Sequence, residues 1–332
     1  MKRTRHPWLR VRLAAVAALA LALFAGCAST PSVPAAEGDK AQAKKEVTIA
    51  VQPTLDAAEV QEKAKPLKEF LEKELAKRGT QAEVAIYVPL SQSGAVEALR
   101  FGQADAALMG AWPAFLATDL GAGELALAEI REVIVDQDKK EAPHYFSYWV
   151  VLKESPYKSL NELRGKRVCF PSAVSTSGYV APLGRLVELG LLTKPAKGEV
   201  DPEQFFGGVQ FAGGYAQCWE ALKKGQVDVT VIAGDVPEKL YREALGGTSV
   251  LEQQGPVPSH AVVFSKSLQE PLRSNLREAF LALNDPQQRS LMRQFVSGIF
   301  VRFEPSTADQ HFAGLEKYLN LTGIRFSERV GR

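Results

Sequence analysis

Three consecutive hydroxyl-bearing residues stand before a glycine near the middle of the chain: Ser175, Thr176, Ser177 and then Gly178. They follow a strand signal that ends at Phe170, and the apolar spacing after them predicts a helix over 179–189. A helix N-terminus exposes unpaired backbone N–H groups and the positive end of the helix dipole. Hydroxyls at that place make an oxyanion site that needs no lysine, and the glycine lets a ligand approach the backbone. A plain serine N-cap would need only one hydroxyl, so the run of three favours anion binding.

Signals for covalent or metal chemistry are missing from the sequence. His144, His260 and His311 are scattered, and no pair has the spacing of metal ligands. The sequence contains no Gly-x-Ser-x-Gly elbow, no Walker loop and no His-Glu-x-x-His motif. We therefore expect a binding protein rather than an enzyme, with no catalytic residue, no cofactor and no metal.

Strand and helix signals alternate along the chain and must position the hydroxyl run. Short β-rich runs are expected at the following places: 47–51, 82–88, 104–109, 150–152, 168–170, 209–211 and 227–232. Helical spacing is expected between and after them: around Leu67, Phe70, Leu71 and Leu75, and at 95–101, 179–189, 216–224, 237–245, 270–283, 285–299 and 308–320. Such alternation predicts an α/β protein with largely parallel sheets.

An internal echo suggests two related halves. Residues 97–105 read Glu-Ala-Leu-Arg-Phe-Gly-Gln-Ala-Asp, and residues 220–228 read Glu-Ala-Leu-Lys-Lys-Gly-Gln-Val-Asp. Each unit predicts a helix that ends on a glycine, Gly102 or Gly225, in the left-handed conformation. A strand follows each glycine, although helix–glycine–strand units are also common in unrelated α/β proteins.

The order of these elements predicts two lobes. Residues 47–147 and 253–332 are expected to form lobe one, and residues 148–252 lobe two. The chain would cross twice between the lobes, which makes a hinge that can close over a ligand in the cleft.

The N-terminus has the pattern of a secretory signal. A basic block holds Lys2, Arg3, Arg5, Arg10 and Arg12, and an apolar run then leads to Ala25, Gly26 and Cys27. The small residues before the cysteine resemble a bacterial lipobox, in which the signal (1–26) is removed and Cys27 carries lipid. An ordinary signal with an incidental cysteine is the alternative. Residues 27–46 are rich in Ser, Pro, Ala, Gly and Lys and are expected to be a flexible tether.

Composition narrows the class further. The chain has 40 basic and 38 acidic residues, and without the five basic residues of the signal the balance is 35 against 38, a net charge of −3. A mildly acidic body does not attract nucleic acid. No apolar run after the signal is long enough to span a membrane. We expect a monomer outside the cytoplasm, anchored to a membrane by lipid.

The serine run and its surroundings resemble a known family. The run Ser-Thr-Ser-Gly-Tyr at 175–179, with the segment from Lys158 to Val168 before it and the first echoed unit with Gly110, is similar to the phosphonate- and phosphite-binding (PhnD-like) components of ABC transporters. The resemblance covers about 47–285. It implies a two-lobed periplasmic-binding-protein fold of the type II kind, an oxyanion ligand held by the residues at 175–177, and a membrane permease as partner.

The resemblance also implies other ligand-binding positions, in the loop after the first strand, after the third strand and in lobe two: Gln52, Gln92, Gly110, Trp112, Tyr215 and Asp235. Several of these depart from the family pattern. Gln92 stands in place of a common aromatic residue, Ala111 in place of a proline, and Tyr215 in place of a histidine. Trp112 and Tyr215 can also be core or rim residues, and Asp235 can also be the N-cap of the next helix.

Two cysteines remain after Cys27, and three interpretations stay open for them. Cys169 and Cys218 can form one bridge in an oxidising compartment, and two buried free thiols are expected at least equally. Relatives of this family bind arsenite through thiolates, so both could also contact a soft ion. The sequence therefore predicts the solute-binding component of an ABC importer for a phosphorus oxyanion such as phosphonate, phosphite or phosphate. The alternative is an oxyanion sensor, for example of arsenite, that signals to a membrane kinase.

Overall fold

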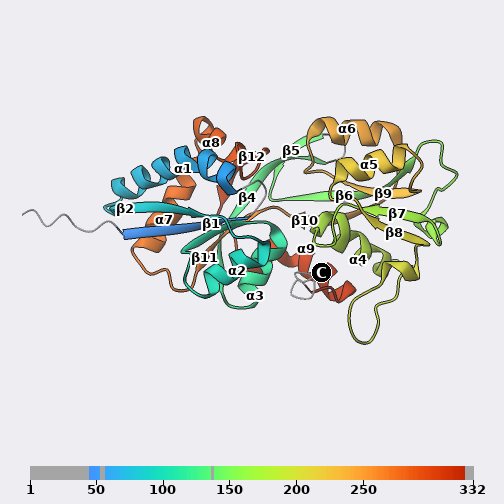
Figure 1. Ribbon diagram of the computed structural model, residues 1–332, viewed down its shortest axis with the longest axis horizontal. Helices are drawn as coiled ribbons and strands as arrows, with labels where there is room; N and C mark the ends of the chain where they lie inside the picture. The colour runs from blue at the N-terminus through green and yellow to red at the C-terminus, as the bar shows by residue number, and fades with distance from the viewer. Residues whose placement is uncertain (1–44, 53–56, 136–137, 326–332) are drawn as a thin grey trace, which may run out of the picture. The chain divides into compact units, whose positions relative to one another are not determined.

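The computed structural model describes residues 45–52, 57–135 and 138–325, which form two sheets with helices around them (Figure 1). Cys27, the predicted signal and nearly all of the predicted tether lie outside the described residues. Among the helices that the structure describes, none is both long and apolar enough to cross a membrane.

The first sheet has seven strands in the order β12-β4-β11-β3-β1-β2, with β5 paired to β4. Its strands are β1 (Lys45–Val51), β2 (Ala82–Tyr87), β3 (Ala106–Met109), β4 (Gly123–Val135), β5 (Asp138–Ala142), β11 (Ala261–Ser265) and β12 (Phe300–Glu304). The second sheet has five strands in the order β10-β6-β9-β7-β8. They are β6 (His144–Leu152), β7 (Arg167–Phe170), β8 (Gly208–Phe211), β9 (Val229–Ala233) and β10 (Thr248–Pro258).

The helices lie between the strands along the chain. They are α1 (Ala57–Lys77), α2 (Gln92–Arg100), α3 (Ala111–Asp119), α4 (Ala181–Glu188), α5 (Tyr215–Lys223), α6 (Glu238–Gly247), α7 (Leu272–Leu281), α8 (Arg289–Arg293) and α9 (Ala308–Thr322). The helical spacing predicted in α1 is confirmed, because Leu67, Leu71 and Leu75 are fully buried. They share one face of the helix and pack against the seven-stranded sheet together with α7.

The prediction of largely parallel sheets was wrong. Among the strand pairs of the described residues, only β1–β2, β1–β3, β7–β8 and β7–β9 are parallel. The strands β4 and β5 are joined by a short connection, and a parallel pair needs a long crossover, so this pair is antiparallel. The strand β6 is antiparallel to both of its neighbours, β9 and β10. The helix predicted over 285–299 is also shorter, because α8 ends at Arg293 and the chain then turns into β12. The strands β4 and β12 and the helix α3 were not predicted.

The internal echo corresponds to matching structure. Gly102 (φ 68°) and Gly225 (φ 64°) both adopt the predicted left-handed conformation. In the first unit Oδ2 of Asp105 accepts a hydrogen bond from the backbone N–H of Thr48 at 2.9 Å. In the second unit Oδ2 of Asp228 accepts one from the N–H of Arg167, also at 2.9 Å. Each unit thus fastens its strand to a parallel neighbour by the same kind of carboxylate contact.

The chain passes between the sheets near Pro143 and Ser259, and the predicted lobe limits near 147 and 252 fall inside β6 and β10, which both belong to the five-stranded sheet. Helix α9 was predicted to complete lobe one, and it packs against α3 as well as against α4 and β10. There Lys317 Nζ lies 2.5 Å from Glu188, and the hydroxyl of Tyr318 accepts a hydrogen bond from the N–H of Gly255 at 2.9 Å. The exact division into lobes stays a prediction.

Candidate functional site

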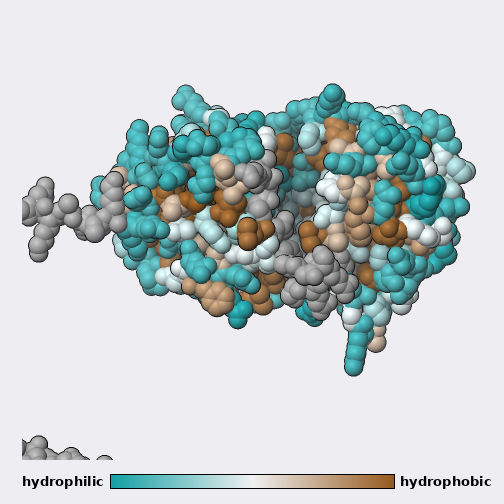
Figure 2. Space-filling view, in the orientation of Figure 1, coloured by the Kyte–Doolittle hydropathy of each residue, from teal (hydrophilic) through white to brown (hydrophobic). Residues whose placement is uncertain are grey.

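A pocket of about 200 Å³ lies where the carboxyl ends of parallel strands from both sheets meet. Figure 2 shows the surface hollowed between the part built on the seven-stranded sheet and the part built on the five-stranded sheet. The pocket is lined by Gln52, Gly110, Ala111, Trp112, Pro113, Tyr145, Val174, Ser175, Thr176, Ser177, Tyr215, Asp235, Pro258 and His260. Segments that directly follow β1, β3, β7, β8 and β9 supply most of this lining, as expected for ligand sites in α/β sheets.

The hydroxyl run forms one wall of the pocket. A single π-helical turn (Thr176–Val180) begins there and continues directly into α4. The hydroxyl of Ser175 accepts a hydrogen bond from the N–H of Gly178 at 2.9 Å, so this serine is the N-cap. Thr176 and Ser177 also line the pocket, beside the positive end of the helix.

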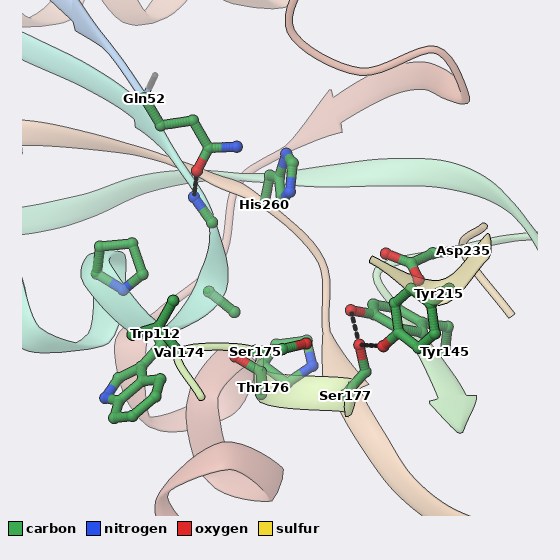
Figure 3. A pocket seen from close by; sticks show the side chains of 14 residues that line it. Gln52, Trp112, Tyr145, Val174, Ser175, Thr176, Ser177, Tyr215, Asp235 and His260 are labelled. Atoms are coloured by element: carbon green, nitrogen blue, oxygen red, sulfur yellow. Dashed lines mark hydrogen bonds between the residues drawn. The ribbon is translucent and has the colours of Figure 1, made fainter. Parts of the chain in front are cut away.

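Two tyrosines surround the hydroxyl of Ser177 (Figure 3). Tyr145, on β6, donates its hydroxyl hydrogen to Oγ of Ser177 at 3.1 Å, and the hydroxyls of Ser177 and Tyr215 are 2.8 Å apart. Burial, followed by the nearby carboxylate of Asp235, raises the pKa values of both tyrosines above the ordinary value. Both phenols therefore keep their protons at neutral pH and can serve as hydrogen-bond donors.

The opposite wall comes from the seven-stranded sheet. The side-chain carbonyl of Gln52 accepts a hydrogen bond from the N–H of Gly110 at 2.6 Å, and this glycine is the N-cap of α3. The fixed carbonyl leaves the amide nitrogen of Gln52 directed toward the side of His260 (Figure 3). Trp112, in the first turn of α3, is 2% exposed and packs in the core while also lining the pocket.

A buried ionic cluster lies behind the pocket. Arg131, on β4, donates through Nη1 to Oδ2 of Asp235 at 2.9 Å and lies 3.5 Å from Oε1 of Glu129. Burial raises the pKa of Glu129, and the charge of Arg131 opposes this. The ion pair joins a strand of the seven-stranded sheet to the loop after β9 in the five-stranded sheet. Asp235 was also considered as an N-cap, but the N-cap of α6 is Pro237, which makes no side-chain capping bond.

The structure brings most of the predicted residues together. Of the predicted set, the following line one pocket: Gln52, Gly110, Trp112, Ser175, Thr176, Ser177, Tyr215 and Asp235. Gln92 is the first residue of α2, and its side chain lies outside the described part of the structure. Gly178 does not line the pocket. A Cβ atom on it would lie 2.2 Å from Cγ of Pro171, so the glycine makes room for that ring and not for a ligand.

Sequence reasoning did not include His260 or Tyr145 among the candidate ligand-binding residues, although both line the pocket. Neither residue belongs to a recognisable motif. Tyr145 stands inside β6, and His260 stands where the chain returns from β10 to β11. The one available signal was that both lie next to a predicted crossing between lobes, where side chains from either lobe can reach the cleft.

The two cysteines form a disulfide between β7 and α5, with their Cα atoms 5.4 Å apart. Of the interpretations left open for the two cysteines, the structure therefore shows the bridge, because β7 and the first turn of α5 pack directly on each other. The sulfur atoms are bonded to each other and neither cysteine lines the pocket, so the interpretation as soft-ion ligands has no free thiolate to support it. The bridge instead fastens the strand before the serine loop to the helix that begins with Tyr215.

Comparisons with known proteins agree with this architecture. A phosphate-import protein, PhnD, from Mycolicibacterium smegmatis is 27% identical over 220 residues, which cover 65% of this chain and 63% of that protein, less than two thirds of its length. The solved structure of XAC2383 from Xanthomonas citri bound to ATP has a TM-score of 0.65 at 17% identity and covers 83% of this chain and 99% of its own. PhnD1 from Prochlorococcus marinus in complex with methylphosphonate has a TM-score of 0.57 at 18% identity. This match covers 83% of this chain and 97% of PhnD1.

A binding protein component of an ABC phosphonate transporter from Pseudomonas aeruginosa has a TM-score of 0.59 at 19% identity, with 84% of this chain and 87% of its own covered. These likenesses confirm the two-lobed α/β fold of periplasmic binding proteins. The family model described as "ABC transporter, phosphonate, periplasmic substrate-binding protein" matches residues 49–312. The chain therefore belongs to the family of periplasmic substrate-binding proteins of phosphonate ABC transporters.

Proposed function

We propose that this protein captures a small phosphorus oxyanion outside the cytoplasm and delivers it to the permease of an ABC importer. The observation that carries this proposal is the convergence of three helix N-termini on one pocket. Helix α3 begins after Gly110, the helical segment that leads into α4 begins at Thr176, and α5 begins at Tyr215. Each start exposes backbone N–H groups and a positive dipole end toward the same space.

The chemistry of the lining suits an oxyanion held by neutral donors. None of the lining residues that the structure describes is lysine or arginine, and their hydroxyls, amides and imidazole can donate hydrogen bonds. Such bonds are charge-assisted when the acceptor is an anion, and they are strong in a desolvated pocket. A volume of about 200 Å³ is below the usual range for drug-sized ligands, which favours a compact ligand such as phosphonate, phosphite or phosphate.

Asp235 supports selection for ligand charge. Its carboxylate lines the pocket, and Arg131 donates to Oδ2, so among the described residues no donor is bonded to Oδ1. A carboxylate in the pocket repels a bare dianion and accepts a hydrogen bond from a protonated oxygen or an amine. We therefore expect monoprotonated or amine-bearing phosphonates to bind better than fully ionised ones.

Closure and anchoring complete the proposal. The two sheets are joined by chain passages near Pro143 and Ser259, and we propose that the lobes 47–147 with 253–332 and 148–252 close over the ligand by bending there. Closed lobes would present a joint surface to the permease. The lipobox-like sequence at Cys27 supports a lipid anchor after removal of residues 1–26, which mass spectrometry of the mature protein would detect.

The test is a thermal-shift screen of the mature protein, starting after Cys27, with phosphite, methylphosphonate, 2-aminoethylphosphonate, phosphate, sulfate and arsenite. A ligand at about a hundred times its Kd stabilises the folded state by about 2.7 kcal/mol, which gives a clear rise in Tm. We expect this rise for at least one phosphorus compound and not for sulfate. A response to arsenite alone, or to none of the six, contradicts the proposal.

A further inference from the structure

His260 lines the pocket but does not belong to the N-terminus of α3, of α5 or of the helical segment that leads into α4. Its side chain is 23% exposed and lies directly after Ser259, where the chain passes from one sheet to the other. A Cβ atom placed on Gly110 would lie 3.9 Å from Nε2 of the imidazole, so this ring edge stands beside the start of α3. Figure 3 shows the ring on the pocket wall next to Gln52, on the side toward which the Gln52 amide nitrogen is directed.

The other ring nitrogen of His260 faces a buried carboxyl group. Nδ1 lies 3.4 Å from Oε2 of Glu129, whose side chain is 1% exposed. Within the described part of the chain, neither Nδ1 nor Oε1 of Glu129 has a hydrogen-bond partner. Buried polar atoms in folded proteins are almost always paired, so an unpaired imidazole nitrogen that faces a carboxyl oxygen requires an explanation. A small approach of Nδ1 to Oε2, with one proton between the two atoms, would give this nitrogen a hydrogen-bond partner.

The surrounding charges favour neutral forms of this pair. Burial lowers the pKa of His260 well below its ordinary value, and the charges of Arg131 and His311 lower it further. Burial raises the pKa of Glu129, and the nearby Asp235 adds to this while Arg131 opposes it. The remaining histidine of the described residues, His144, lowers the pKa of His311. When a neutral carboxylic acid donates to Nδ1, the single N–H hydrogen of the neutral ring is on Nε2, at the pocket.

We propose that His260 is a ligand-binding residue of this pocket, and that it shares one proton with Glu129 so that its Nε2–H donates to an oxygen of the bound oxyanion. This inference rests on the proposed function. A bound anion beside the ring favours the protonated pair, so ligand and proton bind cooperatively. Affinity is then constant at low pH and falls as the pH rises through the apparent pKa of the unliganded pair. Above that pKa, binding takes up a proton.

The experiment is calorimetric titration with methylphosphonate and with inorganic phosphate, from about pH 5.5 to pH 8.5. Each pH is measured in two buffers of different ionisation enthalpy, which gives the number of protons taken up on binding. The ligands titrate themselves, so the informative quantity is the difference between the wild type and His260→Gln. The glutamine keeps an N–H donor but cannot titrate. On binding, we expect the wild type to take up as much as one proton more than His260→Gln does. Its affinity should fall up to roughly tenfold more per pH unit than the affinity of this variant.

Two further variants separate a shared proton from a structural role. Glu129→Gln is expected to lower the pH range in which proton uptake occurs, because the imidazole alone beside Arg131 resists protonation. His144→Gln, which removes a nearby histidine outside the pocket lining, should keep the proton uptake of the wild type. Equal uptake in the wild type, His260→Gln and Glu129→Gln, with binding intact, overturns the inference and leaves the proposed function standing. Failure of the wild type to bind either ligand rejects both.

Discussion

Replacing Arg131 with methionine tests the ionic cluster behind the pocket. The side chain of Arg131 is 7% exposed, and its removal leaves two carboxylates without their shared cation. Asp235 is 16% exposed and borders the pocket, so water can reach it, whereas Glu129 is 1% exposed. The loss of stability is therefore concentrated at Glu129. Breaking a buried ion pair from one side typically lowers the free energy of unfolding by about 3–5 kcal/mol, and we expect a loss in this range at pH values at which Glu129 is ionised in the wild type.

The loss of stability in Arg131→Met should become larger as the pH rises. The pKa of Glu129 is already raised in the folded protein, and removal of the opposing charge of Arg131 raises it further. Folding then takes up a proton at pH values between the unfolded pKa and the folded pKa, so the free energy of unfolding falls as the pH rises through this window. The variant should be closest to the wild type at about pH 5, toward the lower end of this window, and furthest from it above neutrality.

The assay is urea-induced unfolding of the wild type and the variant at several pH values. The matched control is Arg302→Met, which removes a partly exposed arginine of the same sheet that pairs with Glu304 and Glu141. Exposed ion pairs contribute about 0–1 kcal/mol, so this control should change stability little. A second change, Glu129→Gln, should recover part of the loss in Arg131→Met. A loss below about 1 kcal/mol, or a loss that does not change with pH, would refute the reasoning about burial.

Further predictions concern the serine loop and its support. Reducing the Cys169–Cys218 bridge should lower the free energy of unfolding by about 2–4 kcal/mol. Because the bridge fastens two pocket-lining segments to each other, its reduction should also weaken ligand binding. Unchanged ligand affinity in dithiothreitol would contradict this effect on binding. Gly178→Ala should destabilise by about 1–3 kcal/mol through the clash with Pro171, as thermal unfolding would show. The control Gly246→Ala, in open space on α6, should stabilise by about 0.5–1 kcal/mol.

Local patterns predicted the part of the site that is contiguous in sequence. The run of hydroxyls from Ser175 to Ser177 could be read as a helix start because strand, loop and helix signals stand side by side in the chain. The echoed units could be read in the same way, and their glycines adopt the predicted conformation. Neither required knowledge of which strands are neighbours.

The remaining features depend on contacts between distant segments. Arg131 and Asp235 are 104 positions apart and meet only because β4 passes next to the five-stranded sheet. Gly178 has the sequence context of a ligand-binding glycine, yet the ring of Pro171 explains it. The antiparallel pairings of β4, β6 and β10 are set by which strands become adjacent, and alternation of strand and helix signals does not contain that information.

The central claim is that the helix N-termini at the pocket bind a phosphorus oxyanion. Its most direct measurement is calorimetric titration of methylphosphonate and phosphate into the wild type, Thr176→Ala and Ser172→Ala. Thr176 lines the pocket, whereas Ser172 belongs to the same loop and does not. We predict that at least one of the two ligands binds the wild type and Ser172→Ala alike, and that its affinity for Thr176→Ala falls by roughly tenfold, the equivalent of one charged hydrogen bond. Equal affinity in all three proteins, or no binding to the wild type, would contradict the account.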